Sequence, residues 1–423
     1  MLTSGGDGAT VQRSIVQRVD LPKRGLEPYR RIVGDELLAE IRDLAADLRG
    51  LRVLELSSTA TGGGVAELLL SLVPLERDIG LDAEWRVIAG DQPFFTTTKR
   101  IHNGMQGMDV ELTDAERSAY LERNRANAEA LTDGWDVVIV HDPQPAAVRS
   151  FCTVTHARWV WRCHIDSSTP HASVWEFLRP YVEQHDRVVF TLDDFVPPDL
   201  DMPTSILAPA IDPLSSKNRS LPDWLAREAV AEFGVDLARP LMVQVSRFDP
   251  WKNPFGVVDA WRRAREAVPG LQLAMVGAMA HDDPEGWEVY EALETLAREE
   301  SDLLLFTNQM GVARHEVNAF QTVADVAVQM SIREGFGLVV SETLWKGTAM
   351  VAGRAGGIPL QLSDGVSGFL ADGVEDVADR VVTLLDDPRL ARELGAAGAK
   401  VVQERYLLPR LLRDQIALLR DLL

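Results

Sequence analysis

The chain has 423 residues, of which 46% are hydrophobic and 25% are charged, and its formal net charge at pH 7 is −21. This length exceeds what one hydrophobic core usually holds and suits two globular domains of similar size. The acidic charge argues against nucleic acid and anionic membrane surfaces as partners, because both attract basic faces.

The chain begins with a polar segment, residues 1–12, which carries no apolar signal region. No later apolar run approaches the roughly 18 residues of a membrane span. The two cysteines, Cys152 and Cys163, predict no disulfide framework. We therefore expect a cytoplasmic protein without membrane attachment.

The first half of the chain alternates helices with short apolar strands. Helices are expected at 34–48 and 65–78, and the turn sequence 57–64 precedes the second of them. The expected strands are 51–56, 83–89, 136–140, 158–162, 187–191 and 204–207. This alternation predicts an α/β domain whose parallel sheet is covered by helices on both faces.

The same pattern restarts after a stretch rich in Pro, Ser and Asp, residues 209–240, which holds a helix at 224–233. The second set comprises strands at 241–245, 271–276, 303–306, 326–329 and 348–351, and helices at 256–267, 287–300, 314–322 and 338–346. Amphipathic helices at 376–406 and 411–423 end the chain. We interpret this as two doubly wound, Rossmann-like domains, 1–213 and 214–404, and we allow for a final helix, about 405–423, that packs back on the first. Ligands of such domains bind at the carboxyl ends of the strands.

One such strand end carries two glutamates, Glu334 and Glu342, on either side of a Gly-Phe-Gly turn. The turn opens the helix at 338–346, whose first amides and dipole favour an anion, and its glycines allow close approach of a phosphate. A nucleotide sugar would present hydroxyl groups to both carboxylates. The alternative is an ordinary strand–turn–helix with solvated glutamates.

The loop after the first strand of the second domain carries two cations, Arg247 and Lys252. Arg grips phosphate with its planar fork, and Lys adds a point charge. We interpret the pair as a phosphate site. The alternative is a surface ion pair between Arg247 and Asp249.

Strand ends in the first domain supply three weaker candidates. The triplet Gly62, Gly63 and Gly64 resembles a phosphate cradle and equally suits a plain tight turn. His164 fits a substrate contact and equally fits a structural role, and no second His or Cys pair predicts zinc beside it. Asp142 fits a sugar hydroxyl or the cap of the following helix.

Together these segments resemble the retaining nucleotide-sugar glycosyltransferases of the GT-B fold, the large family that includes sucrose and glycogen synthases. That family carries two glutamates separated by seven residues, as at Glu334 and Glu342, and an Arg and a Lys on the loop matched by Arg247 and Lys252. Within it the chain is most similar to the trehalose synthases, and the likeness runs from about Arg52 to the C-terminus. The segments that carry this closer resemblance are residues 62–67, 98–103, 141–145, 161–166 and 209–214.

The resemblance implies a donor site for a nucleoside-diphosphate glucose in the second domain. Glu342 would take the ribose hydroxyls, Glu334 the donor glucose hydroxyls, and Arg247 and Lys252 the departing diphosphate, with His164 beside the donor sugar. The other expected donor contacts are Gly62, Gly63, Gly64, Gly337, Leu338 and Asn308. No cofactor or protein-bound metal is required by this fold, and magnesium is at most a stimulant.

The acceptor is expected to be free glucose, bound by the first domain. Its contacts are taken from predicted strand ends and loops: Asp142, Gln144, Lys99, His102 and Asn103. Two adjacent cations, Lys99 and Arg100, leave glucose 6-phosphate as an alternative acceptor. A trehalose phosphorylase, another retaining transferase and a non-catalytic nucleotide-sugar sensor remain alternatives for the whole chain, and we allow for a homodimer.

Overall fold

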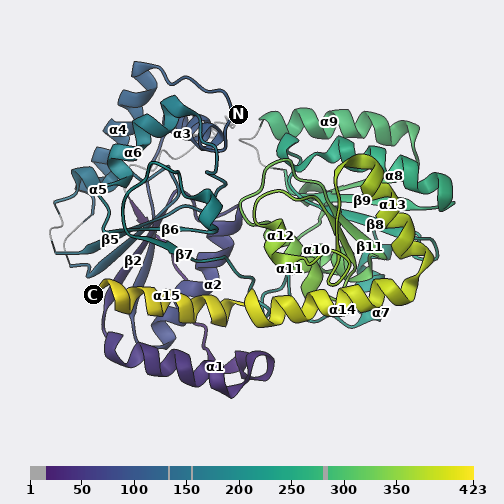
Figure 1. The fold of residues 1–423 in the computed structure, drawn as a ribbon, viewed down its shortest axis with the longest axis horizontal. Coiled ribbons are helices and arrows are strands. Elements are labelled where there is room, and N and C mark those ends of the chain that lie inside the picture. Colours follow the sequence, from purple (N-terminus) through teal and green to yellow (C-terminus); the bar gives the residue numbers. More distant parts are fainter. Residues whose placement is uncertain (1–15, 132–133, 154–155, 280–283) are drawn as a thin grey trace, which may run out of the picture. The chain divides into compact units, whose positions relative to one another are not determined.

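The computed structural model describes residues 16–131, 134–153, 156–279 and 284–423, and the described chain divides into two compact units (Figure 1). The first unit comprises residues up to Gly25, Arg42–Ile206 and Ile416–Leu423. The second comprises Leu26–Ile41 and Leu207–Gln415. Each unit is an α/β domain built on its own sheet, as the alternating pattern predicts.

The first unit has a seven-stranded sheet in the order β1-β3-β2-β4-β5-β6-β7, parallel throughout except for β1 against β3. Its strands are β1 (Gln17–Arg18), β2 (Arg52–Ser57), β3 (Asp82–Val87), β4 (Val137–His141), β5 (Arg158–Arg162), β6 (Arg187–Phe190) and β7 (Thr204–Ile206). Its helices are α2 (Gly64–Asp78), α3 (Gln92–Met105), α4 (Asp114–Glu129), α5 (Val148–Phe151) and α6 (Ala172–Val182). Leu54, Val138 and Trp161 lie in one core on one sheet face. Alternate residues such as Val53 and Val137 are also fully buried, so helices cover both faces.

The second unit has a six-stranded, all-parallel sheet in the order β10-β9-β8-β11-β12-β13. Its strands are β8 (Leu241–Val245), β9 (Gln272–Gly277), β10 (Leu303–Thr307), β11 (Val326–Gln329), β12 (Met350–Ala352) and β13 (Phe369–Leu370). Its helices are α7 (Asp223–Ala231), α8 (Pro254–Ala267), α9 (Pro284–Glu299), α10 (Arg314–Val323), α11 (Leu338–Trp345), α12 (Ile358–Gln361), α13 (Gly373–Asp386) and α14 (Pro388–Arg405). Met242 of β8 lies in one core, whereas its neighbours Leu241 and Val243 lie in another on the opposite face. The core on each face stabilises the unit by about 1.5–3 kcal/mol for each large apolar side chain fully buried.

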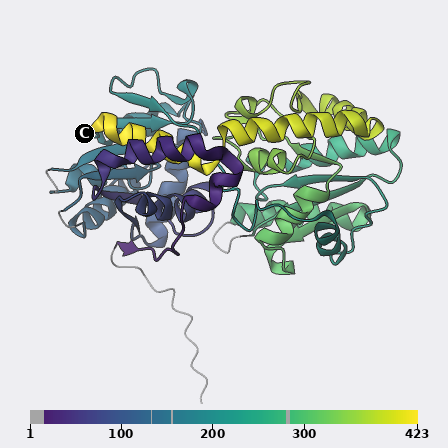
Figure 2. The ribbon, with the colours of Figure 1, turned by 90° about the horizontal axis from the view of Figure 1, so that it is seen from below.

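Two helices pass from one unit to the other along the chain, α1 (Arg30–Ala45) and α15 (Leu408–Leu422). They run side by side (Figure 2), with ion pairs from Arg413 to Glu40 and from Arg420 to Asp47. Gly34 has φ 82° and ψ 173°, so the regular helix of α1 follows this glycine. At the end of α15, Asp421 pairs with Arg187 of β6 at 2.6 Å.

The single long helix expected at 376–406 is wrong, because the structure has two helices with a break at Asp387. Pro388 lacks an N–H and favours the first position of a helix, and the Asp387 side chain accepts hydrogen bonds from the amides of Arg389 and Leu390. Both features belong to a helix start, so α14 begins anew there. Hydrophobic periodicity continues across the break and does not reveal it.

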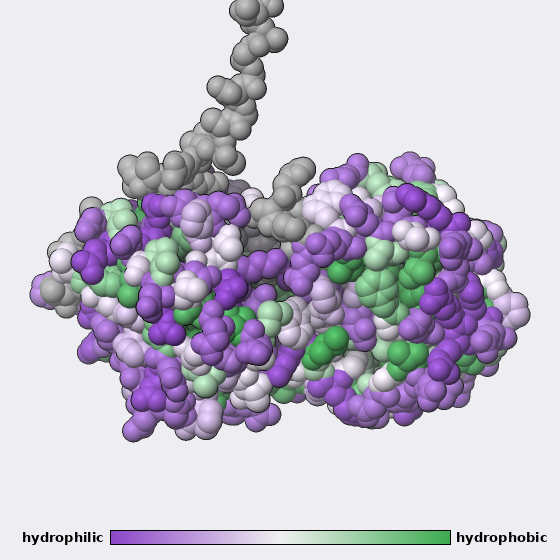
Figure 3. All heavy atoms as spheres, turned by 90° about the horizontal axis from the view of Figure 1, so that it is seen from above, coloured by the Kyte–Doolittle hydropathy of each residue, from purple (hydrophilic) through white to green (hydrophobic). Residues whose placement is uncertain are grey.

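The molecular surface in the view of Figure 3 is mostly hydrophilic, and hydrophobic residues form small separate patches on it. This agrees with the acidic composition of the chain. None of the described helices combines the length and the apolar character needed to cross a lipid bilayer.

Candidate active site

The Gly-Phe-Gly turn of the second unit leads from β11 into α11, as the sequence predicts. Gly337 is the residue before the first turn of α11 and has φ 82°, a left-handed conformation that favours glycine. Leu338 begins the helix, so its amide and the next ones lack partners within the helix. Residues Gly337 and Leu338 therefore present the anion-attracting end of a helix dipole.

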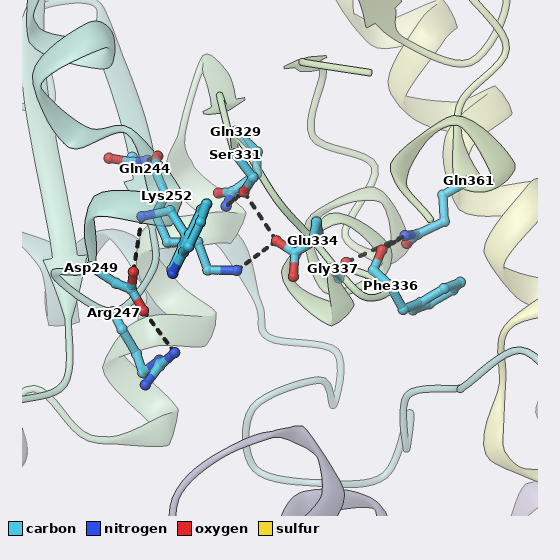
Figure 4. A network of polar contacts seen from close by, with 11 residues as sticks. Gln244, Arg247, Asp249, Lys252, Gln329, Ser331, Glu334, Phe336, Gly337 and Gln361 are labelled. Atoms are coloured by element: carbon cyan, nitrogen blue, oxygen red, sulfur yellow. Dashed lines mark hydrogen bonds and ion pairs between the residues drawn. The ribbon is translucent and has the colours of Figure 1, made fainter. Parts of the chain in front are cut away.

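Glu334, on the other side of the turn, forms an ion pair with Lys252 (Figure 4). Lys252 Nζ lies 2.6 Å from Glu334 Oε2, and the Ser331 hydroxyl donates to the same oxygen at 3.0 Å. The two charged side chains are only 18% and 11% exposed. An ammonium group has three donors, so Lys252 is held in place by a carboxylate and still suits a second anion.

Arg247 lies on the same loop and pairs with Asp249, with 2.8 Å between Nη2 and Oδ2. Asp249 is itself fixed, because its other oxygen accepts a hydrogen bond from the Trp251 amide. The Arg247 side chain is 58% exposed. The structure thus forms the ion pair of the alternative interpretation, and it places a solvent-accessible guanidinium on the loop that also carries Lys252.

Glu342 is buried in α11 and contacts a lysine that the sequence did not reveal. Lys217 Nζ lies 2.9 Å from Glu342 Oε1, and the Glu342 side chain is 2% exposed. Its second oxygen, Oε2, is buried and has no hydrogen-bond partner among the described residues. A buried carboxylate oxygen without a donor is costly, and a ligand hydroxyl would satisfy it.

Lys346, one turn beyond Glu342, is buried beside this pair. Its ammonium donates to the Glu342 carbonyl at 2.9 Å and to Asn218 Oδ1 at 3.2 Å. Burial lowers the pKa of Lys346 to about 7, Glu342 opposes that shift, and the positive charge of Lys217 adds to it. Lys346 is therefore nearly balanced between its charged and neutral forms at neutral pH, beside the ion pair of Lys217 and Glu342.

The turn between the two glutamates is held from behind by the segment after β12. Gln361 of α12 is fully buried, donates to the Phe336 carbonyl at 2.6 Å and accepts from the Ser341 hydroxyl at 2.5 Å (Figure 4). Gly356 has φ 50°, and a Cβ there would lie 1.6 Å from the Glu334 carbonyl oxygen. The position of Glu334 therefore depends on a glycine that no other residue can replace without moving the turn.

Asn308, a predicted donor contact, follows β10. Its amide side chain accepts from the Met279 amide at 2.7 Å and donates to the Met279 carbonyl at 3.2 Å. Both functions of this side chain thus join the loops after β9 and β10. Only the backbone around Asn308 is left to contact a ligand.

In the first unit, Asp142 follows β4 and has φ 65°, a left-handed conformation that is uncommon outside glycine. Its carboxylate accepts from the His164 amide at 2.8 Å, whereas α5 begins only at Val148 with Ala147 before it. The helix-cap alternative for Asp142 is therefore wrong. Burial raises the pKa of Asp142 to about 6, although the hydrogen bond from the His164 amide and the charge of Arg162 oppose this.

His164 follows β5 and is the outer member of a buried chain of three side chains. His164 Nε2 lies 2.8 Å from His141 Nδ1, and His141 Nε2 lies 2.6 Å from Glu55 Oε2. His141 and Glu55 are 1% and 0% exposed. Burial lowers the pKa of His164 well below its ordinary value, and the charge of Arg162 adds to this effect, so the ring is neutral at pH 7.

The glycine triplet forms the start of α2. Gly62 and Gly63 have φ of 73° and 86°, and Gly64 is the first helical residue. A Cβ at Gly62 or Gly63 would meet no atom within 4 Å. These glycines are thus required by backbone conformation, and their surroundings leave room for a ligand at a helix N-terminus.

Three predicted acceptor contacts, Lys99, His102 and Asn103, do not lie at strand ends or in loops, because all three are on α3. Asp91 accepts from the Phe94 amide and so starts this helix, and Phe94, Ile101 and Met105 form its buried face. Arg100, the second cation considered for a phosphate, pairs with Glu116 at 2.9 Å and donates to the Glu111 carbonyl.

Gln144 lies two residues after Asp142, and its Oε1 atom is buried without a hydrogen-bond partner among the described residues. Its carbonyl accepts from the Asn124 side chain at 3.2 Å. Gln144 and Asp142 therefore both lie at the end of β4, and each offers an oxygen atom suited to a neutral hydroxyl donor. As for metals, no group of three or more His, Cys, Asp or Glu side chains suited to a cation occurs in the described part of the chain.

Sequence reasoning missed Lys217, Gln361, His141 and Glu55. Lys217 lies in the irregular stretch between the domains, where no periodicity marks it. Glu55 did carry a signal, because an acidic residue between Leu54 and Leu56 in a strand buried on both faces requires a partner. That partner, His141, is 86 residues further along the chain.

Comparison with known proteins agrees with these two units. A family model for the N-terminal domain of trehalose synthase matches residues 55–197, and a model for group 1 glycosyl transferases matches residues 227–401. The chain is 49% identical to the trehalose synthase of Rubrobacter xylanophilus over 415 residues. This alignment covers 97% of this chain and 100% of that protein. The chain belongs to the trehalose synthase family. It is also 43% identical to the trehalose synthase of Pyrococcus horikoshii, over 95% of this chain and 97% of the relative.

Solved structures show the same fold at much lower sequence identity. An α,α-trehalose-phosphate synthase (UDP-forming) from Burkholderia xenovorans, in complex with glucose-6-phosphate, matches with a TM-score of 0.68 and 16% identity, over 88% of this chain and 99% of that chain. This likeness establishes the GT-B fold. Family membership and the match to group 1 glycosyl transferases identify the chain as a trehalose-related glycosyltransferase.

Proposed function

We propose that this glycosyltransferase transfers glucose from a nucleoside-diphosphate glucose to free glucose with retention, and so forms α,α-trehalose. The observation that carries the proposal is the arrangement around α11. An ion pair between Lys252 and Glu334 lies before the helix, and within the helix lies a buried Glu342 oxygen that has no hydrogen-bond partner in the described part of the chain. Family membership supports a trehalose-related product.

The donor is proposed to bind the second unit. The ribose would donate a hydroxyl hydrogen to Glu342 Oε2, the diphosphate would meet the amides at Gly337 and Leu338, and glucose hydroxyls would contact Glu334. Lys252 and Arg247 would stabilise the negative charge that develops on the leaving diphosphate. A cation held beside a carboxylate before the ligand arrives needs little reorganisation during the reaction.

The acceptor is proposed to bind the first unit through Asp142 and Gln144, with Lys99, His102 and Asn103 on α3 as further contacts. Free glucose is favoured over glucose 6-phosphate because Arg100 is already engaged by Glu116. His164 and the glycines Gly62–Gly64 are proposed as further ligand contacts of this unit, to a sugar hydroxyl and to phosphate respectively.

The reaction would proceed on one face of the donor sugar. The bond from the anomeric carbon to the diphosphate oxygen breaks as the acceptor oxygen approaches, and the departing phosphate oxygen takes the acceptor proton. The diphosphate leaves as the second product. The protein's task is to orient both sugars and to stabilise the leaving group, so no pair of glycosidase-type carboxylates is required.

The test is to incubate the chain with glucose and ADP-, UDP- or GDP-glucose, with and without EDTA. We expect free nucleoside diphosphate and a non-reducing disaccharide whose two anomeric protons both show the small coupling of an α linkage. A β linkage would contradict retention. If the nucleotide sugars give no product but trehalose and inorganic phosphate give glucose 1-phosphate, the chain is a phosphorylase. If the donor binds and neither reaction occurs, the chain is a sensor. Loss of activity in EDTA would show that a metal is required.

A further inference from the structure

The side chains of Glu55, His141 and His164 form a hydrogen-bonded series at the carboxyl ends of neighbouring strands. The series ends at His164, beside Asp142. β2, β4 and β5 are adjacent in the sheet, and Glu55 is level with Ile139, two residues before His141 on the same face. The planes of the two imidazole rings differ by 19°, and their centroids are 5.1 Å apart. The hydrogen bond of 2.8 Å therefore runs close to the planes of both rings, along the direction of the N–H and of the lone pair.

The direction of these hydrogen bonds follows from the groups involved. An imidazole is more basic than a carboxylate, with reference pKa values of about 6.5 and 4.3, so the proton between Glu55 and His141 belongs to His141 Nε2. Glu55 favours a second proton on His141, whereas burial of the ring and the permanent charge of Arg162, the direct cross-strand neighbour of His141, oppose it. When His141 carries one proton, on Nε2, its Nδ1 atom has a lone pair that can only accept, and His164 then donates from Nε2.

We propose that Glu55 and His141 are positioning residues that hold His164 in the tautomer protonated at Nε2 and leave its Nδ1 atom as a hydrogen-bond acceptor. Such an acceptor fits a neutral hydroxyl group and does not fit a phosphate oxygen. The identification of that hydroxyl as one of a sugar rests on the proposed function, whereas the tautomer does not.

The backbone at His164 is fixed as well, because its amide donates to Asp142 Oδ1 at 2.8 Å. A ring held by one nitrogen atom and a backbone held by its amide leave the side chain little freedom to turn its second nitrogen away from a ligand. This explains why an acidic residue is retained at 0% exposure inside a parallel sheet. Glu55 acts at a distance, through His141.

The direct test is long-range proton–nitrogen NMR correlation on the whole chain labelled with 15N-histidine, near pH 7. Signals are assigned by replacing one histidine at a time with Gln. We expect His141 and His164 each to be protonated at Nε2 and unprotonated at Nδ1. His185 provides an internal reference of the opposite kind, since its Nδ1 lies 3.0 Å from the Val182 carbonyl, which only accepts. Burial lowers the pKa of His185 to about 4, so it too is neutral at this pH.

A His164 protonated at Nδ1 in the unaltered protein would overturn the proposal, whether or not the protein makes trehalose. Conversely, absence of trehalose synthesis with the expected tautomers would leave the proposal standing and contradict only the proposed function. The two failures are therefore distinguishable.

Kinetics supply the link to the substrate. His141→Asn keeps an oxygen acceptor in place of Nδ1, and His141→Leu removes it. We expect His141→Leu to lower kcat/KM for the sugar donor about tenfold or more, with His141→Asn closer to the unaltered protein and binding of free nucleoside diphosphate unchanged in both. His185→Gln and Glu76→Gln, at two other buried sites of the first unit, are the controls. Equal losses in His141→Asn and His141→Leu, or equal losses of nucleotide binding, would show that His141 is merely structural.

Discussion

The two units share a parallel-sheet architecture, but the polar side chains at the carboxyl ends of their strands differ in charge and burial. In the first unit, burial raises the pKa of Asp142 to about 6 and lowers that of His164 well below its ordinary value, so both groups are displaced toward their neutral forms. In the second unit, the corresponding side chains form ion pairs, as in Lys252 with Glu334 and Lys217 with Glu342, and burial lowers the pKa of the neighbouring Lys346 to about 7. The first set suits a neutral ligand held by directed hydrogen bonds, and the second suits an anion.

The difference teaches that strand ends of one architecture are adapted to their ligands through local burial and pairing. The chain as a whole has a net charge of −21, which would repel a nucleotide. The cations on one loop, Arg247 and Lys252, and the positive end of the α11 dipole offset this locally. The predictions below test whether the charged site and the neutral site are as separate in function as they are in chemistry.

The largest effect is expected for the cations of the second unit. Lys252→Ala and Arg247→Ala should each lower kcat about a hundredfold, corresponding to about 3 kcal/mol, because one contact to the leaving diphosphate is lost. Lys400→Ala and Arg389→Ala, which alter exposed ion pairs on α14, are matched controls. Near-normal steady-state rates in both site variants would reduce the loop to a surface ion-pair site.

The glutamates should separate nucleotide from sugar. Glu342→Ala should weaken calorimetric binding of free nucleoside diphosphate by about 1–3 kcal/mol, because the ribose loses its acceptor. Glu334→Ala should leave that binding unchanged or slightly stronger, since it releases Lys252 from its carboxylate partner, and should instead impair turnover of the sugar donor. Glu342→Gln controls for packing around Lys217. Equal weakening by both alanine variants would mean that the turn has collapsed or that the roles are reversed.

In the first unit, Asp142→Ala should raise the KM for glucose about tenfold and leave the KM for the donor almost unchanged, because a buried partner of a sugar hydroxyl is removed. Asp186→Ala is a suitable control. Asp186 also accepts a backbone amide hydrogen bond, from Trp159. It directly precedes β6 and therefore lies at the amino ends of the strands, away from the carboxyl ends where Asp142 lies. An increase in the KM for the donor, without an increase in the KM for glucose, would contradict the assignment of Asp142 to the acceptor.

The smallest effect concerns stability. The folded pKa of Asp142 exceeds its unfolded value, so its contribution to the free energy of unfolding is present below about pH 4 and lost as the pH rises through about 6. Asn keeps the oxygen acceptor and tolerates φ of 65°. Asp142→Asn should therefore be more stable than the unaltered protein at pH 7, by about 1 kcal/mol after allowance for partial exposure, and no more stable at pH 4. Denaturant unfolding at pH 7 and at pH 4 measures the free energy of unfolding of both proteins. The same difference between the two proteins at both pH values would contradict a raised pKa of Asp142.

The sequence predicts what local pattern determines. Apolar runs locate the strands of both sheets except the two-residue strands β1 and β13, and the glycines around Phe336 locate the start of α11 within a residue. The break at Asp387 depends on one proline and one cap, which periodicity does not register. The placement of Lys99 on a helix was missed because the neighbouring Thr and Asn residues are weak helix formers, and the helix becomes evident only when the Asp91 cap and the buried face are considered together.

The site was less accessible to prediction than the fold, because its decisive contacts join residues far apart in sequence. Lys252 and Glu334 are 82 residues apart, and Glu55 and His141 are 86 apart. Residue type suggested Lys252 and Glu334 as separate ligand contacts, and the ion pair between them was not predicted. Nothing in the spacing suggested the second pair, or the role of Lys217, since only the fold brings these residues together.

The most direct test of the division between a neutral and a charged site is the choice of acceptor. Initial rates with glucose and with glucose 6-phosphate are compared at equal concentration, with one nucleoside-diphosphate glucose as donor. We predict a much faster reaction with glucose and trehalose as the product, because the first unit offers Asp142, Gln144 and a neutral His164, and Arg100 is engaged by Glu116. A clear preference for glucose 6-phosphate, with trehalose phosphate as the product, would contradict this account.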